Sequence, residues 1–460
     1  MAIEFLLERF DQTKDAEALI WGDSYGALVP AGTQCVRYRS VLYSELGQLV
    51  KFWQERLQKE VVPKGAVIAL EADFSPNSVA LLLSLLQHNC IVALLTAEMK
   101  TSRDELRQIA EVEWIIKVSL DDNVSIEQTG TQARHELLHQ LRDRQHPGLI
   151  IFTSGSTGKS KAAVHDFILM QEKFQTVRPA QRTLLFLLFD HIGGINTLLH
   201  VLANGGCAVI PLDHSPETVA AAIAKHRIQV LPTSPTFLNL LLLGGVHQRY
   251  DLSSLEIVTY GTEVMPESVL SNLNQLFPNI RFHQTYGLTE LGIMRSKSRS
   301  SDSLWFKVGG EGYETRIVNG MLEIQAKSAM LGYLNAPAPF TPDGWYMTGD
   351  LVEIDGDWLK ILGRKSELIN VGGQKVYPAE VENVLQTMEG VLEVSVKGEA
   401  NPITGNIVTA KVRLTTDESL REFRIRLRAF CQDKLESYKI PMRVMLVKEK
   451  LHSDRFKKTH

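Results

Sequence analysis

Cysteine is scarce in this sequence, with four residues in 460. No two of them form a C-x-x-C pair, because Cys35, Cys90, Cys207 and Cys431 are far apart along the chain. This spacing argues against both a disulfide framework and a zinc site. The cysteine usage therefore fits a reducing compartment, and we expect a cytoplasmic protein.

An excess of charge of one sign is also missing. The chain has 49 Lys and Arg against 53 Asp and Glu, a formal net charge of -4. A protein that wraps nucleic acid would carry a clustered basic excess, so no nucleic-acid partner is expected. The N-terminus has acidic residues early and no cationic start before an apolar core, which argues against a secretory signal.

Long uninterrupted apolar runs are lacking as well. The most apolar window, residues 79–95, is broken at Gln87, His88 and Asn89. It predicts a buried helix followed by a strand at 91–95, and no membrane span is expected. The hydrophobic content of 44% is still ample for a large domain and a smaller one.

The richest local signal is the segment 149–165, LIIFTSGSTGKSKAAVH. An apolar strand leads into a loop of glycines, hydroxyls and lysines, a composition suited to a polyphosphate. Glycine allows positive φ and close approach to an anion, while hydroxyls and ammonium groups donate to phosphate oxygens. The candidate phosphate-binding residues are Thr153, Ser154, Gly155, Ser156, Thr157, Gly158, Lys159 and Lys161.

A P-loop is the obvious rival, since Gly158-Lys159-Ser160 matches the end of its pattern. However, Thr153 stands where that pattern needs its first glycine, which disfavours P-loop geometry. The segment instead resembles the T-S-G-[ST]-T-G-x-P-K-G loop of the adenylate-forming superfamily of acyl-CoA synthetases, amino-acid-adenylation domains and luciferases. Ser160 and Ala162 depart from the proline and last glycine of that loop.

The order of predicted elements indicates an α/β fold. Residues 38–260 alternate strands and helices, typical of parallel sheets covered on both faces. From residue 311 short alternating segments with hairpin signals at Asn319-Gly320 and Asp355-Gly356 predict antiparallel β structure. We expect a large N-terminal AMP-binding domain over 1–362, with βα-layered sheets plus the antiparallel β segment, and a small, mobile α+β C-terminal domain over 363–460.

Further segments occur in the order in which the superfamily has them. Thr285-Tyr286-Gly287-Leu288-Thr289-Glu290 resembles Y-G-x-T-E. The resemblance implies that Tyr286 lies against adenine, Thr289 contacts phosphate and Glu290 serves Mg²⁺. A π face, a hydroxyl donor and a hard carboxylate oxygen suit these three tasks. Gly261-Thr262-Glu263 stands where the superfamily has a glycine-containing turn, and the resemblance implies that this turn lies against adenine and the acyl pocket.

Two more segments resemble the superfamily's ribose site and interdomain junction. In the segment 345–350, Asp350 would accept hydrogen bonds from both ribose hydroxyls. Arg364 would add a second ribose contact, and Ser366 occupies the hinge position. Gly372-Gly373, within INVGGQKVYPAEVE, would line the approach of a thiol.

The C-terminal tail resembles P-x-T-x-x-G-K, whose lysine stabilises the charge that builds between the carboxylate and the α-phosphate. His452 stands for the proline, and the spacing selects Lys458 as the catalytic lysine. Lys457 remains a competitor at the adjacent position.

The acid pocket has two interpretations at 189–194, FDHIGG. If His191 matches the gate residue of acyl and aryl ligases, the substrate is a fatty, short-chain or aromatic acid. If Asp190 matches the F-D pair of amino-acid-adenylation domains, its carboxylate would hold an ammonium group. The following Gly193-Gly194 favours the acyl interpretation.

The resemblance implies an ATP-dependent acid–thiol ligase with ATP and Mg²⁺ as cofactors. A small carboxylic acid would form an acyl-adenylate, and CoA or phosphopantetheine would then accept the acyl group. An enzyme that loads an acyl or amino acid on a carrier protein is the alternative; a basic stripe at Arg421, Arg424 and Arg428 would face such an acidic partner. A non-catalytic nucleotide-binding homologue is the third possibility.

Overall fold

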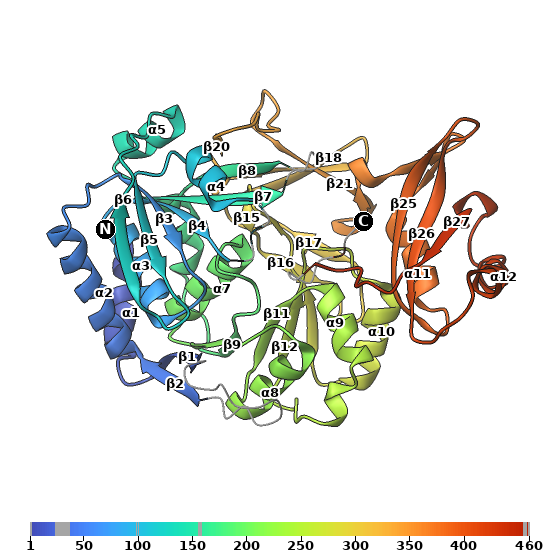
Figure 1. Cartoon of the computed structure of the whole chain (residues 1–460), viewed down its shortest axis with the longest axis horizontal. Coiled ribbons are helices and arrows are strands. Elements are labelled where there is room, and N and C mark those ends of the chain that lie inside the picture. The colour runs from blue at the N-terminus through green and yellow to red at the C-terminus, as the bar shows by residue number, and fades with distance from the viewer. Residues whose placement is uncertain are drawn as a thin grey trace.

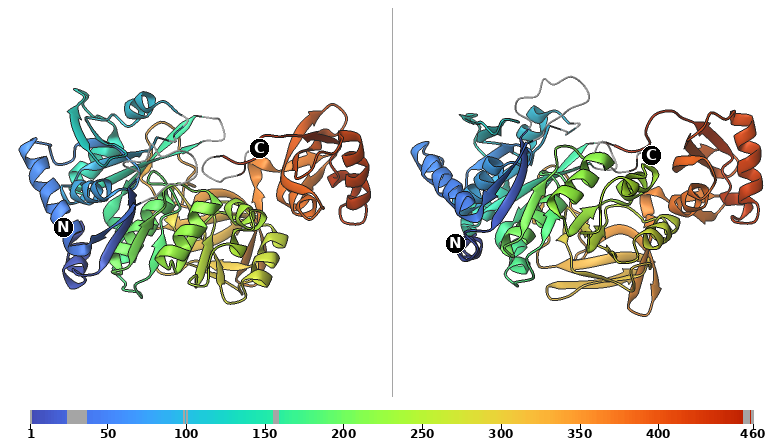
Figure 2. Two further views of the ribbon diagram at one scale, coloured as in Figure 1. Left: turned by 60° about the horizontal axis from the view of Figure 1, so that its bottom comes forward. Right: turned by 90° about the horizontal axis from the view of Figure 1, so that it is seen from below.

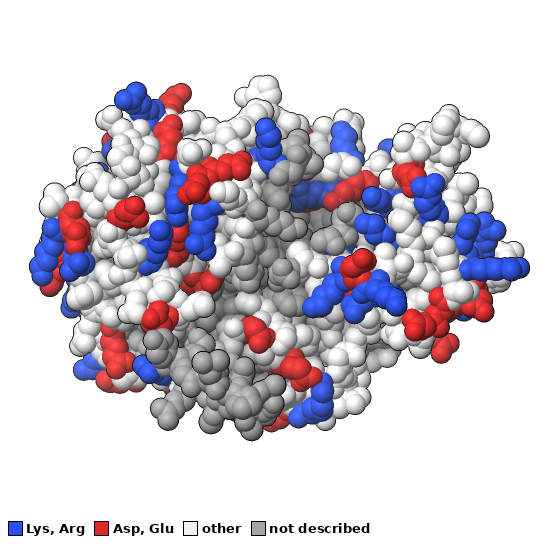
Figure 3. Space-filling view, viewed as in Figure 1, with Lys and Arg blue, Asp and Glu red and all other residues white. Residues whose placement is uncertain are grey.

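The computed structural model describes residues 2–23, 37–97, 99, 101–154, 159–453 and 458, without the side chains of residues 23, 37 and 154. Its larger part contains three large sheets and a two-stranded one, and a smaller part, coloured orange to red, lies beyond α10 at one end of the molecule (Figures 1 and 2). The expected α/β fold with a small α+β C-terminal domain is confirmed. Lys and Arg are interspersed with Asp and Glu on the face shown in Figure 3.

The first seven-stranded sheet has the order β13-β12-β11-β9-β10-β1-β2, in which β2 alone is antiparallel to its neighbour. Its strands are β1 Glu17–Asp23, β2 Arg37–Leu42, β9 Arg182–Leu184, β10 Cys207–Ile210, β11 Val230–Thr233, β12 Ile257–Tyr260 and β13 Arg281–Gln284. Strand β9 ends at Leu184, so residues 185–191 form the connection that carries Asp190 and His191.

The second seven-stranded sheet has the order β20-β8-β7-β4-β3-β5-β6. Its strands are β3 Val67–Glu71, β4 Ile91–Leu95, β5 Trp114–Val118, β6 Val124–Gln128, β7 Gly148–Ser154, β8 Ser160–Asp166 and β20 Gly332–Tyr333. Strands β7 and β8 form an antiparallel hairpin in which Ser154 pairs with Ser160. The sequence did not indicate the second strand of this hairpin, which follows the predicted phosphate loop along the chain.

Helices pack on both sheets, as predicted. One core combines residues of β3, β4 and β10 with α1 Glu4–Gln12, α2 Tyr43–Lys59, α3 Pro76–Gln87 and α7 Ile192–Ala203. A second core sets α8 Pro216–His226, α9 Pro235–Leu243 and α10 Glu267–Leu276 against the first sheet, and a third sets α4 Arg103–Ile109 and α5 Glu136–Arg144 against the second. The short helix α6 Phe167–Gln171 follows β8.

Three of these helices begin with the same local signal. The hydroxyls of Ser75, Ser215 and Ser234 accept hydrogen bonds from backbone N–H groups of the first turn. In each case proline follows directly, at a position where the missing N–H costs nothing. Helix α3 is buried along most of its length. In the part of the chain that the structure describes, no helix is both long and apolar enough to cross a bilayer.

The third sheet has six strands in the order β16-β17-β22-β21-β19-β18, all antiparallel. They are β16 Ser296–Ser298, β17 Phe306–Val308, β18 Tyr313–Val318, β19 Met321–Ala326, β21 Tyr346–Asp355 and β22 Trp358–Arg364. The Asn319-Gly320 turn is confirmed: both residues have positive φ and connect paired Val318 and Met321. The second turn lies one residue later than predicted, because Asp355 pairs with Trp358.

The small part of the chain forms a five-stranded sheet with its own core. Its elements are β23 Ile369–Val371, β24 Gln374–Val376, α11 Pro378–Gln386, β25 Val391–Asn401, β26 Gly405–Leu414, α12 Leu420–Cys431 and β27 Arg443–Leu446. The sheet membership changes between Arg364 and Ile369, which supports the domain boundary that we propose near Gly363. After β27 the tail returns toward the large domain (Figure 2).

Candidate active site

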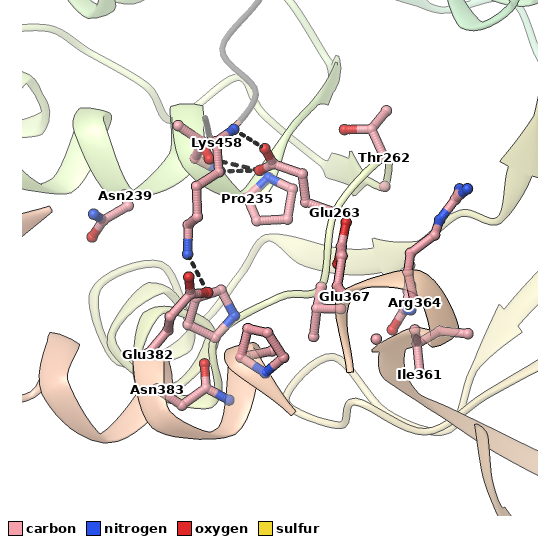
Figure 4. A pocket seen from close by; sticks show the side chains of 18 of the residues that line it. Pro235, Asn239, Thr262, Glu263, Ile361, Arg364, Glu367, Glu382, Asn383 and Lys458 are labelled. Atoms are coloured by element: carbon pink, nitrogen blue, oxygen red, sulfur yellow. Dashed lines mark hydrogen bonds and ion pairs between the residues drawn. The ribbon is translucent and has the colours of Figure 1, made fainter. Parts of the chain in front are cut away.

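A cavity of about 300 Å³ lies between the two domains. The ends of β12 and β13, the start of α9, the last residues of β22, helix α11 and the C-terminal tail all contribute to its wall. Seven of the residues singled out in the sequence line it: Gly261, Thr262, Glu263, Tyr286, Asp350, Arg364 and Lys458. Figure 4 labels Thr262, Glu263, Arg364 and Lys458 among them. Segments almost 200 positions apart thus meet at one place, as the predicted seam between the domains requires.

Asp350 is the polar centre of one wall. Its carboxylate accepts a hydrogen bond of 2.5 Å from the Tyr286 hydroxyl. It also forms an ion pair with Arg364, whose Nε lies 3.0 Å from Oδ1. Burial raises the pKa of Asp350 above its ordinary value, while the Arg364 guanidinium acts in the opposite direction. Burial and the neighbouring Asp350 raise the pKa of Tyr286, so the phenol keeps the proton that it donates. A carboxylate has lone pairs left for further donors.

Glu290 lies in the turn between β14 Gly287–Leu288 and β15 Gly292–Ile293, together with Thr289. Its Oε1 accepts a 2.5 Å hydrogen bond from the Tyr333 hydroxyl. The ammonium group of Lys161 lies 5.2 Å from the centre of the Tyr333 ring. One aromatic side chain therefore contacts both the predicted magnesium ligand and a predicted phosphate-binding lysine.

The phosphate loop is described at its two ends. Thr153 pairs with Lys161 across the β7–β8 hairpin, and Lys159 is exposed. Ser160 stands where the superfamily loop has proline, and its hydroxyl shares a 2.7 Å hydrogen bond with the hydroxyl of Thr101. The predicted residues Gly155, Ser156, Thr157 and Gly158, and the side chain of Ser154, lie outside the described residues.

Lys458 reaches the cavity and contacts both domains. Its backbone N–H donates to Oε1 of Glu263 in the large domain. Its Nζ donates to Oε2 of Glu382 on α11 at 2.7 Å (Figure 4). Lys457 lies outside the described residues, so Lys458 is the member of the pair that the structure places at the cavity.

The turn after β12 is tightly constrained. A methyl group on Gly261 would come within 2.8 Å of both the backbone oxygen and the hydroxyl of Thr285. Thr262 adopts a positive φ of 72°. Glu263 is held by the Thr236 hydroxyl, which donates a 2.6 Å hydrogen bond to its Oε2. Glycine at 261 lets the turn pack against the Y-G-x-T-E segment.

Other predicted residues do not line this cavity: among the described ones these are Thr153, Lys159, Lys161, Thr289, Glu290, His191, Gly372 and Gly373. His191 begins helix α7, where its Nδ1 accepts a 3.1 Å hydrogen bond from the Gly193 N–H. Gly372 and Gly373 form the exposed two-residue turn between β23 and β24, both with positive φ. Their roles toward the acid and the thiol stay predictions.

Sequence reasoning missed two residues of the site. Tyr333 bonds Glu290, yet it stands in no recognisable motif, and only the fold brings the two together. Glu382 lies within the quoted segment INVGGQKVYPAEVE, where it received no role. It is buried. Its Oε1 accepts a 2.8 Å hydrogen bond from the Val396 N–H, and its Oε2 accepts one from Nζ of Lys458. Its burial on α11 could have been inferred from helical periodicity.

We expect His165, on β8, to make the stability of this domain depend on pH. Complete burial lowers its pKa from 6.5 to about 4. The unfolded chain therefore binds more protons between pH 6.5 and pH 4, and stability falls as the pH falls through that window. The loss reaches about 1.4 kcal/mol per pH unit. We expect His165→Gln to reduce this slope in urea unfolding measured from pH 7 to pH 5.

His139 is exposed and serves as the matched control for that measurement. His139→Gln should leave the slope unchanged. An equal slope in wild type and His165→Gln would show that His165 titrates normally in the folded protein.

Comparison with known proteins agrees with this geometry. Residues 6–318, more than half of the chain, match the family model described as AMP-binding enzyme. The chain belongs to the AMP-binding enzyme family. Residues 380–458 also match the model of the AMP-binding enzyme C-terminal domain, and Lys458 is the last residue of this match. The resemblance drawn from the motifs is thereby confirmed for both parts of the chain.

Among similar proteins of this family is indoleacetate–CoA ligase of Aromatoleum aromaticum, 28% identical over 66% of this chain and 64% of that protein. The chain thus spans less than two thirds of that relative. The 2-succinylbenzoate–CoA ligase of Enterococcus faecalis is 25% identical over 87% of this chain and 89% of its own length. A crystal structure of an anthranilate CoA ligase with anthranoyl-AMP superposes with a TM-score of 0.81, at 18% identity, covering 99% of this chain and 95% of that one. This last likeness shows the shared fold.

Proposed function

We propose that this protein is an ATP-dependent ligase that converts a carboxylic acid and ATP into an acyl-adenylate and pyrophosphate. A thiol, CoA or phosphopantetheine, then takes the acyl group and releases AMP. The observation that carries the proposal is the convergence of Tyr286, Asp350, Arg364 and Lys458 on one cavity between the domains. The names of its relatives, which are CoA ligases, support the same reaction.

In the first half-reaction a carboxylate oxygen forms a bond to the α-phosphorus, and the bond from that phosphorus to the leaving pyrophosphate oxygen breaks. Two anions must approach each other, so positive charge is needed where they meet. Asp350 and Arg364 would hold the ribose, and the hydroxyls and lysines of the phosphate loop would hold the β- and γ-phosphates. Lys458 would neutralise the charge at the α-phosphorus once its Nζ leaves Glu382.

Glu290 fits the role of a magnesium ligand. Mg²⁺ in nucleotide sites is commonly held by one or two carboxylates together with phosphate oxygens and water. Among the described residues no cluster of three or more His, Cys, Asp or Glu side chains could hold a metal alone. One carboxylate that is bonded by Tyr333, whose ring lies near Lys161, is the donor set that such a shared site needs. The ion would neutralise phosphate charge.

The second half-reaction needs space that Lys458 fills in this structure. A thiolate must reach the acyl carbonyl carbon, form a C–S bond and displace AMP. We propose that the small domain rotates about Ser366, which lies in the short helical turn Lys365–Glu367 between the two domains. The rotation would withdraw Lys458 and bring the Gly372-Gly373 turn to the path of the thiol.

We infer that the acid lacks an ammonium group. Asp190, the residue that would hold one, is 1% exposed and already makes an interaction within the protein. The relatives named above act on indoleacetate and 2-succinylbenzoate, acids with an aromatic ring. An aromatic or other acyl acid is therefore the proposed substrate class.

A carrier protein is the second candidate acceptor, and one surface observation favours it. Arg421, Arg424 and Arg428 are all exposed on α12, with Ile425, 64% exposed, between them. A basic helix face with an apolar centre suits an acidic helical partner. This surface belongs to the domain that would move toward the thiol.

The test is ATP–pyrophosphate exchange against aromatic, fatty and amino acids, followed by mass detection of products with CoA or with a phosphopantetheine-loaded carrier protein. Exchange with an aromatic or fatty acid and formation of its CoA thioester are expected. Thioester on the carrier protein alone, lost in Arg424→Glu, would favour the second candidate. Absence of exchange across the panel with ATP still bound would contradict catalysis.

A further inference from the structure

The tail that carries Lys458 is anchored at its root by a buried cluster. His452, at 6% side-chain exposure, contacts Oε1 of Glu393 on β25 through its Nδ1. Oε2 of the same carboxylate accepts hydrogen bonds from Nη1 of Arg413, on β26, at 2.8 Å and from the Leu451 N–H at 3.4 Å. Burial raises the pKa of Glu393, but the hydrogen bonds from His452 and Arg413 outweigh it and leave the pKa below its ordinary value. Glu393 therefore stays ionised and keeps its donors.

This anchor connects directly to Lys458. The backbones of His452 and Lys458 pair as an isolated antiparallel bridge. Paired residues of antiparallel chains have their Cα atoms about 5 Å apart, so the position of His452 sets that of Lys458. The Lys458 amide reaches Glu263 from this point, and its Nζ reaches Glu382. A displaced His452 would displace both contacts.

A long lysine side chain is otherwise costly to hold in one place. Ordering its backbone and long side chain opposes folding by about 1–2 kcal/mol for the backbone of each residue and a similar amount for the lysine side chain. Fixing the root of the tail on Glu393 removes much of this freedom before substrates bind. The position of His452 is the one where the resembled tail pattern has proline, whose ring has no hydrogen-bonding group.

We propose that His452 is a positioning residue for Lys458. Its contact with Glu393, shared with Arg413, fixes the start of the tail so that the bridge presents Lys458 to the cavity. The inference rests on the proposed function, because it assigns His452 to the adenylate-forming step. His452 acts through Lys458 and has no role in the transfer to the thiol.

The decisive variant is His452→Ala, measured in the two half-reactions separately. Pyrophosphate exchange at saturating ATP and acid should fall by about 10–100-fold, since displacement of a catalytic group by about 1 Å can cost 10²-fold. The dissociation constant for ATP and the rate of thioester formation from supplied acyl-adenylate should stay close to those of wild type. An equal loss in both half-reactions would show a general structural role and overturn the proposal.

Two further variants sharpen the result. His452→Asn keeps a hydrogen-bond donor near the place of Nδ1, so it should restore a large part of the exchange rate. Lys450→Ala removes an exposed side chain of the same tail and should leave both half-reactions unchanged. Failure of His452→Asn to improve on His452→Ala would contradict an anchor made by that hydrogen bond.

A measurement independent of catalysis separates this inference from the proposed function. Amide hydrogen exchange at Leu451 and Lys458, whose N–H groups donate to Glu393 and Glu263, should accelerate in His452→Ala and remain slow in Lys450→Ala and His452→Asn. If wild type catalyses no pyrophosphate exchange with any acid, the proposed function fails, and the hydrogen-exchange result still judges the anchor. Unchanged protection of the tail in His452→Ala would overturn the anchor itself.

Discussion

Replacement of Lys458 by alanine is expected to lower ATP–pyrophosphate exchange by about 10²–10³-fold, the cost of removing one preorganised charge from a transition state. Thioester formation from supplied acyl-adenylate should be spared, because that step needs the lysine to be absent. Lys458 lines the cavity and is held there by Glu263 and Glu382. Rapid-quench measurements of the two half-reactions would report the difference.

Lys457→Ala is the matched control, since it removes the same side chain one position earlier. It should retain most of the exchange activity. A larger loss in Lys457→Ala than in Lys458→Ala would assign the catalytic role to Lys457. Equal loss of both half-reactions in Lys458→Ala would refute the proposed rotation of the small domain.

Replacement of Asp350 by asparagine should raise KM for ATP by about 10–100-fold, with a smaller effect on kcat. Hydrogen bonds to a charged group contribute about 1.5–3 kcal/mol, and about 1.4 kcal/mol corresponds to a factor of ten. Asparagine keeps one acceptor oxygen, but its amide group cannot accept from Arg364 or a ribose hydroxyl. Initial-rate kinetics with varied ATP, together with direct titration of AMP, would measure the change.

Glu353→Gln is the control on the same strand. Glu353 is exposed and faces Lys360 at 3.7 Å, away from the cavity lining. This variant should leave KM for ATP unchanged. If Asp350→Asn binds AMP as tightly as wild type does, Asp350 has no part in holding the ribose.

Much of the fold could be predicted because its signals are local. Helix α8 spans 216–226, where Ser215 and Pro216 mark the start and a four-residue apolar repeat marks the buried face. The Asn319-Gly320 turn was predictable because few other residue pairs tolerate positive φ twice in succession. The motif residues that line the cavity were predictable because their order along the chain resembles that of the superfamily.

The contacts within the site could not be predicted in the same way. Tyr333 and Glu290 are 43 positions apart, and Lys458 and Glu263 are 195 apart. Periodicity reports which side of an element is buried, but it does not report which distant element covers that side. Strand β8 was missed for a related reason: its middle residues are small alanines, and its pairing with β7 decides its conformation.

Arg364 lies two positions before Ser366, at the last residue of β22. Its partner Asp350 lies on the neighbouring strand β21 of the large domain, so a ribose held by this pair would lie close to the proposed hinge. We expect the departure of AMP and the return of the small domain to be timed by the same pair of side chains. Slow release of AMP would then delay the next cycle until the small domain has brought Lys458 back to the cavity.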